Sequence, residues 1–124
     1  MNITITTIPH AAQRYATAGD WYFPPKGGDL TICVSKMPDH RFELLVAVHE
    51  LIEALACQQA GITTAEVDQF DMTWDSHGKY LEPGLDPRAP YHVQHMLANF
   101  VEAGLADVLG VDQTAYAEAL EALG

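Results

Sequence analysis

The chain has 124 residues, which is a usual length for one domain, and we expect residues 1–124 to form a single domain. Hydrophobic residues make up 48% of the chain, too many for a disordered acidic segment, so a packed core is expected. Seventeen acidic residues against six Lys and Arg give a formal charge of −11. This charge disfavours nonspecific nucleic-acid binding, which requires clustered basic residues. A cation remains a suitable ligand, because carboxylates and histidines bind metals.

Neither a membrane segment nor a signal peptide is predicted. No apolar run reaches the roughly 18–20 residues that cross a bilayer. The first residues do not have the basic start and apolar block of a secretory signal. We therefore expect a cytoplasmic protein with no membrane partner.

The first third of the chain predicts three strands. Residues 2–8 alternate Ile and Thr, and 20–23 form a short aromatic run that stops at two prolines. Residues 30–37 are rich in β-branched side chains, and a glycine-containing turn precedes them. Residues 10–17 fit either a short helix or a loop.

The remainder predicts helices. Apolar spacing and helix-capping residues place them at 40–59, 63–70, 91–109 and 113–123. The glycine- and proline-rich residues 76–90 predict a long loop, and long loops in small domains are often functional. Strands followed by helices indicate an α+β fold, and we expect a small antiparallel sheet packed against three to four helices.

The residues most informative about chemistry are His49, Glu50 and Glu53, which form a His-Glu-x-x-Glu motif in the first predicted helix. His49 and Glu53 are four positions apart, so they lie one turn apart on the same face and can bind one metal ion. Glu50 is displaced by about 100° around the helix. It would therefore point beside the ion and could hold a metal-bound water.

A helical wheel sets these residues against the apolar stripe of the same helix. Residues such as Leu44, Leu45 and Leu51 fall between about 180° and 320° when Phe42 is set at zero. His49 then lies at the rim of this stripe. We expect the stripe to be buried. The metal-binding side chains at its rim would then be partly shielded from water but still accessible to a ligand.

The motif resembles that of the zincin metallopeptidases, which carry His-Glu-x-x-His on a helix beneath an antiparallel sheet. His49 matches the first histidine of that motif, and Glu50 matches its catalytic glutamate. The resemblance implies a zincin-like fold, a bound zinc ion, a water activated by Glu50 and a third ligand further along the chain. Glu53 stands where the family has its second histidine, and this departure also suits iron or manganese.

A second pair of histidines, His92 and His95, opens the third predicted helix. His92 lies on the rim of the apolar stripe formed by residues such as Met96 and is the preferred third ligand. His95 lies on the polar face and could be a ligand, a proton donor or a solvated histidine. Glu102 shares the face of His95 and could orient it.

Two further residues are candidates for the site. Asp71, directly after the predicted helix that follows the motif helix, could bring a carboxylate to His49 and serve as a metal ligand. Tyr91 or His95 could stabilise an oxyanion during hydrolysis. In this interpretation Glu50 and Tyr91 are catalytic, and the metal ligands come from His49, Glu53, His92, His95 and Asp71.

A second resemblance covers residues 37–118. Four blocks, 49–54, 67–71, 82–95 and 110–112, look like those of small proteins of bacteriophages and prophages. This resemblance groups the motifs into one constellation and implies a bacterial or phage-infected host cell. It implies no particular activity.

The sequence suggests four functions. The leading one is a metal-dependent hydrolase acting on a small peptide or amide. The second is a non-catalytic structural or phage accessory module in which a metal staples two helices together. An acidic interaction protein without metal is disfavoured, because the carboxylates do not form long runs. A di-iron protein is disfavoured because it would need repeated Glu-x-x-His pairs, and only His-x-x-His and Glu-x-x-Glu spacings are present.

Overall fold

Three strands form a mixed sheet in the computed structural model, which describes all residues, 1–124. The strands are β1 (Ile3–Ile8), β2 (Gly19–Tyr22) and β3 (Leu30–Ser35), and their order is β1-β3-β2. β3 pairs in parallel with β1 and antiparallel with β2. The α+β class is therefore confirmed, but the expectation of an antiparallel sheet is wrong for β1.

The parallel pairing follows from the segment between β1 and β2. This segment contains a short 3-10 helix, η1 (His10–Ala12), and carries the chain to the far edge of the sheet. β2 then turns back to β3, so β1 and β3 run in the same direction. Parallel strands need such a crossover, whereas antiparallel neighbours need only a short turn.

The central strand carries the core of the sheet. Leu30, Ile32 and Val34 alternate along β3, and all three are fully buried. β1 lies at an edge, and Ile3 and Ile5 remain 43% and 47% exposed although they share the face of the buried β3 residues. The core therefore lies over β3 and β2.

Four helices follow the sheet. They are α1 (His40–Ala60), α2 (Thr64–Thr73), α3 (His92–Val108) and α4 (Gln113–Leu123). All four were predicted, and α2 continues three residues beyond its expected end. Asp39 caps α1, Thr63 and Glu66 form a capping box on α2, and Asp112 caps α4. These caps satisfy backbone N–H groups that have no partner within the helix.

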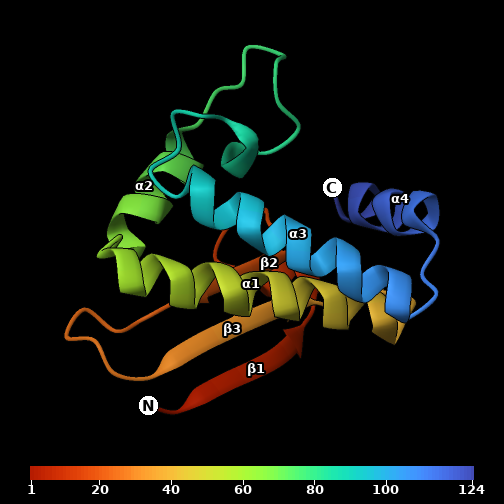
Figure 1. Ribbon diagram of the computed structural model, residues 1–124, viewed down its shortest axis with the longest axis horizontal. Coiled ribbons are helices and arrows are strands. Elements are labelled where there is room, and N and C mark those ends of the chain that lie inside the picture. The colour runs from red at the N-terminus through yellow and green to blue at the C-terminus, as the bar shows by residue number, and fades with distance from the viewer.

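The helices α1 and α3 lie side by side, and α1 packs against the sheet (Figure 1). α1 crosses the sheet and contacts β2 and β3, and α3 lies alongside α1 on the side away from β1. α2 and the long loop lie at one end of this pair, and α4 lies at the other. No helix has both the length and the apolar composition that crossing a membrane would require.

The helical-wheel prediction is wrong about the buried face of α3 and holds only in part for α1, where Leu45 of the expected stripe is buried but Leu44 is 46% exposed. The apolar stripe of α3 points outward, since Val93 and Phe100 are 73% and 79% exposed, whereas His95 on its polar face is buried. On α1, Glu50 and Glu53 lie among the buried residues. The physical reason is that these two polar faces meet each other, and their imidazoles and carboxylates pair, which offsets the cost of burying them.

Candidate metal centre

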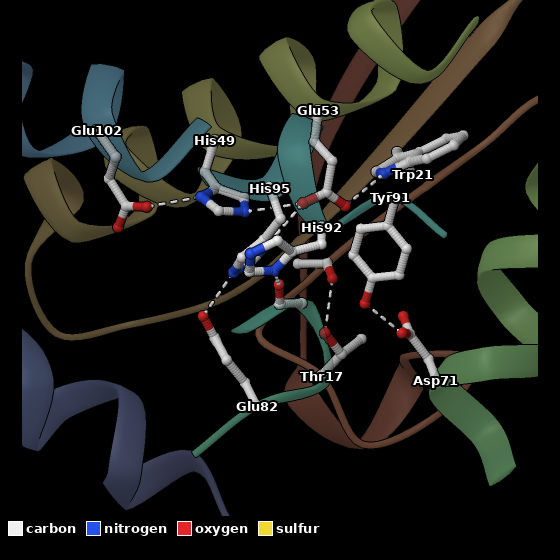
Figure 2. Close-up of polar contacts among 12 residues, drawn as sticks. Thr17, Trp21, His49, Glu53, Asp71, Glu82, Tyr91, His92, His95 and Glu102 are labelled. Atoms are coloured by element: carbon white, nitrogen blue, oxygen red, sulfur yellow. Dashed lines mark hydrogen bonds and ion pairs between the residues drawn. The ribbon is translucent and has the colours of Figure 1, made fainter. Parts of the chain in front are cut away.

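Three side chains predicted as metal ligands converge between α1 and α3 (Figure 2). Glu53 Oε2 lies 3.2 Å from His49 Nε2 and 2.7 Å from His95 Nδ1. The imidazole rings of His49 and His95 meet edge to face with centroids 4.7 Å apart. All three residues are nearly buried, with side chains 7–11% exposed. Two helices that are distant in the sequence thus bring two nitrogens and one oxygen to a single point.

The spacing and chemistry of these atoms fit one metal ion. The three ligand atoms all lie within 4.8 Å of one another. Ligands held about 2.1 Å from a tetrahedral ion lie roughly 3.4 Å apart, so small side-chain movements would complete the coordination. Two imidazoles and a carboxylate are ligands for zinc, iron or manganese. The chain therefore has a possible metal-binding triad, His49, Glu53 and His95.

Two glutamates orient the imidazoles. The Nδ1 of His49 donates to Glu102 Oε1 at 2.8 Å, and Glu102 in turn accepts a hydrogen bond from Tyr116 at 2.7 Å. The Nε2 of His95 donates to Glu82 Oε1, also at 2.7 Å. Carboxylates placed behind metal-binding histidines hold the ring orientation and raise ligand basicity. Each histidine of the triad thus has one nitrogen facing the shared point and the other bound to a carboxylate.

Trp21 fixes the carboxylate of the triad. Its indole Nε1 donates to Glu53 Oε1 at 3.0 Å, which leaves Oε2 to face both imidazoles. Trp21 lies on β2 and is 4% exposed. The edge strand β2 thereby sets the rotamer of Glu53 on α1. The centre is thus supported by β2 as well as by α1 and α3.

The electrostatics of the triad are those of a closely paired ionic network. Burial opposes a charge on His49, but the hydrogen bonds to Glu102 and Glu53 outweigh burial and raise its pKa to about 11. For His95 burial again acts against the charge, and Glu53 and Glu82 raise the pKa to about 9. Burial alone would raise the pKa of Glu53, yet the two imidazoles lower it to about 2. Without an ion, the imidazoles are therefore protonated, and their positive charges offset the charge of Glu53 as a bound cation would.

Glu50 lies beside the triad and faces the sheet. It is buried, and its pKa is raised well above its usual value, first by burial and then by the charge of Glu53. A Cβ on Gly19 of β2 would come within 2.4 Å of Glu50 Oε1, so only glycine leaves room for this carboxylate. No residue donates a hydrogen bond to it.

A second glycine makes room for His95. A Cβ on Gly84 would lie 2.4 Å from Cγ of the His95 ring. Gly84 belongs to a 3-10 turn, η2 (Pro83–Leu85), and its carbonyl accepts a hydrogen bond from His92 Nδ1 at 2.8 Å. The long loop is thus packed directly on the imidazole, and His92 fastens it to α3.

The other sequence candidates lie around the triad. His92 binds the loop backbone and is outside the group of three ligand atoms. Asp71 is also outside that group, because its carboxylate accepts hydrogen bonds from the hydroxyls of Tyr91 and Tyr15. Tyr91 packs edge to face against His95, with centroids 6.1 Å apart. Its hydroxyl points to Asp71 rather than to the triad (Figure 2).

Several residues that shape the centre were not singled out from the sequence. Glu82 and Gly84 belong to the block 82–95 of the second resemblance but had no role assigned to them, and Trp21 and Gly19 have no motif around them. Only the fold places these four residues at the centre. Glu102 was expected to orient His95, but it binds His49 instead. Its position seven residues after His95, two turns along the same helix face, was the available signal.

Comparison with models of known protein families, with curated proteins and with solved structures finds no match for this chain.

Proposed function

We propose that the chain binds one divalent metal ion through His49, Glu53 and His95 and uses it to hydrolyse a small peptide or amide. Zinc is the ion that two imidazoles and a carboxylate fit best, and iron or manganese would also be accepted. The observation that carries the proposal is the convergence of three ligand atoms within 4.8 Å, backed by carboxylates on both histidines.

Glu50 is the residue proposed to act on water. A bound divalent ion would lower the pKa of a water molecule and polarise a carbonyl group. Glu50 lies one residue from His49 on the same helix, and its carboxylate has no hydrogen-bond partner. It is therefore free to accept a proton from water and to pass it to a leaving amine. The raised pKa of Glu50 makes its carboxylate a stronger base than a solvent-exposed glutamate.

The small size of the proposed substrate follows from how the centre is enclosed. Glu82, half exposed behind His95, marks where the centre approaches solvent. Two cavities, of about 210 and 420 Å³, are lined by residues between Phe70 and Arg88 and by none of the triad. A short peptide or amide entering beside Glu82 suits this arrangement better than a folded protein.

A structural role for the metal is the second candidate. The observation that favours it is the burial of the triad, because side chains 7–11% exposed leave little room for a substrate. The ion would then join α1 to α3 and stabilise the fold. The two candidates share the metal and differ in whether Glu50 has a chemical task.

The test separates metal binding from hydrolysis with three single variants. Protein stripped with a chelator is titrated with zinc, manganese or ferrous iron, and metal content and cleavage of short fluorogenic peptides are measured. We expect one ion per chain for the wild type, none for His49→Ala, and one for Glu50→Gln with cleavage lost. His77→Ala is the matched control, since it removes an exposed imidazole outside the triad and should keep both properties.

Each outcome decides a separate point. If none of the three metals binds the wild type, the proposed function is wrong. If Glu50→Gln loses the ion, Glu50 is a ligand rather than a base. If the wild type binds metal and cleaves none of the peptides, the structural role replaces the hydrolytic one.

A further inference from the structure

The outward face of α3 carries a continuous apolar stripe that no part of the chain covers. Val93, Phe100 and Val108 are 73%, 79% and 83% exposed, and Met96 and Leu97 between them are about half exposed. The spacing of three and four residues places all five on one side of the helix. Such a stripe is the pattern of a helix that packs against a partner, yet α1 packs on the opposite face.

We propose that this stripe is the interface of a homodimer in which α3 pairs antiparallel with α3 of a second copy. The proposal concerns the face opposite the candidate metal centre, and it stands whether or not a metal binds. Three features of the stripe, namely its charge, its glycine and its area, favour a second copy as the occupant.

The charge of this face suits a copy of the same chain. The molecule carries a formal charge of −11, so most pairings of two copies would bring like charges together. The outward side of α3 has a single charged residue, Asp107, because the other charge on the helix, Glu102, points inward to His49. A cationic partner would be drawn to the acidic surfaces, whereas this face, with Asp107 as its one charge, suits an apolar face of the same kind.

A glycine in the stripe supplies the matching shape. Gly104 lies in the middle of the outward face, and a Cβ placed on it would meet nothing within 4 Å. Glycine weakens a helix relative to alanine, and nothing in the single chain requires it here. Phe100 stands one turn earlier and projects into solvent. The stripe thus has a protruding ring next to a hollow, which are the two parts of a self-complementary contact.

A two-fold axis level with position 102 makes these parts meet. In an antiparallel pair about that axis, Phe100 of each copy lies over Gly104 of the partner subunit. Met96 then lies against Val108 of the partner subunit, and the reverse contacts follow by symmetry. Such reciprocal contacts are the property of an isologous dimer interface.

The area is sufficient for a stable pair. The five exposed side chains leave on the order of 600 Å² of apolar surface per chain, taking roughly 200 Å² for a large side chain. Two copies would together bury about 1,200 Å², which is the lower bound for specific stable interfaces. An uncovered apolar patch of this size is at the upper end of what monomers expose, and such patches are often functional.

Sedimentation equilibrium of the full chain tests the proposal. We expect a dimer for the wild type at tens of micromolar. Phe100→Glu should raise the dissociation constant at least about 30-fold, as loss of a central aromatic contact does. Gly104→Gln should also dissociate the dimer by filling the hollow, and it guards against misfolding, because its side chain meets open space in the single chain. Met72→Glu, on the exposed face of α2, is the matched control and should remain dimeric.

Two results would overturn the proposal. One is a wild type that sediments as a monomer throughout this range. The other is a dimer that survives both Phe100→Glu and Gly104→Gln while circular dichroism shows native helix content. If that surviving dimer is lost in Ile5→Lys, the copies pair through the exposed edge of β1 instead of α3.

Discussion

Two tyrosine hydroxyls and one carboxylate show how opposing forces set the state of a single side chain. Asp71 accepts hydrogen bonds from Tyr91 and Tyr15, which favour its ionised form. Burial acts in the other direction and is the larger effect, so the pKa of Asp71 rises to about 6. The folded protein therefore holds a proton on Asp71 more tightly than the unfolded chain does.

This shift predicts a pH dependence of stability with a definite sign. Because the pKa of the carboxyl is raised, ionisation destabilises the folded state. The contribution of Asp71 to the unfolding free energy therefore falls as pH rises from about 4 to about 6. Asp71→Asn removes that contribution. Relative to the wild type, the variant should gain on the order of 2 kcal/mol in unfolding free energy between pH 4 and pH 7. Urea denaturation followed by tryptophan fluorescence at both pH values measures the difference.

A gain for Asp71→Asn is expected only if burial outweighs the two tyrosine hydrogen bonds. A difference between variant and wild type that stays constant with pH would show that the two effects cancel. If the unfolding free energy of the variant falls relative to that of the wild type as pH rises, the tyrosines stabilise the anion. Tyr15→Phe offers the matched check, because removal of one donor should raise the pKa of Asp71 further.

At the scale of elements, two glycines decide how closely the backbone approaches the site residues. Gly19 on β2 leaves room for Glu50, and Gly84 in η2 leaves room for the ring of His95. Both have ordinary backbone angles, so a side chain is excluded by space and not by conformation. The sheet edge and the long loop thus act as walls that hold α1 and α3 side chains in place.

Gly84→Ala should therefore impair the metal centre without touching a ligand. The new methyl would displace His95, and we expect metal affinity to fall about 10- to 100-fold, the usual effect of disturbing residues behind a ligand. Isothermal titration with zinc measures the change. Gly104→Ala is the matched control, since Gly104, like Gly84, has no positive φ but has open space around it. Equal affinities for the two variants would contradict the role given to Gly84.

Across the whole molecule, the acidic charge is distributed unevenly. Arg14 neutralises Asp20 and Asp68 and so ties the segment before β2 to α2. Glu50, Glu53, Glu82 and Glu102 instead gather around two imidazoles from four directions. A cation at this point would relieve repulsion in a chain of formal charge −11 and would join α1 to α3.

Metal should accordingly raise the melting temperature of the whole domain. An ion that binds only the folded chain adds about 2.7 kcal/mol at a free concentration 100 times its dissociation constant. For a domain of this length that corresponds to a rise of roughly 10 °C. Differential scanning calorimetry of chelator-treated protein, with zinc added and then removed again, measures the shift. Glu53→Gln should show almost no shift. A wild type whose melting temperature does not change with metal would contradict the proposal that the ion joins α1 to α3.

The sequence alone determined the helices, the strands and the residues of the metal-binding motif, because capping residues, prolines and the one-turn spacing of His49 and Glu53 are local features. Tertiary structure decided what local periodicity could not. It chose the parallel pairing of β1, since that depends on where the chain crosses the sheet. It also turned the polar face of α3 inward, so that His95 joins the triad while His92 binds the loop. Ion pairs between α1 and α3 stabilise this arrangement. The pattern of one helix cannot reveal them, because each pair needs a side chain from the other helix.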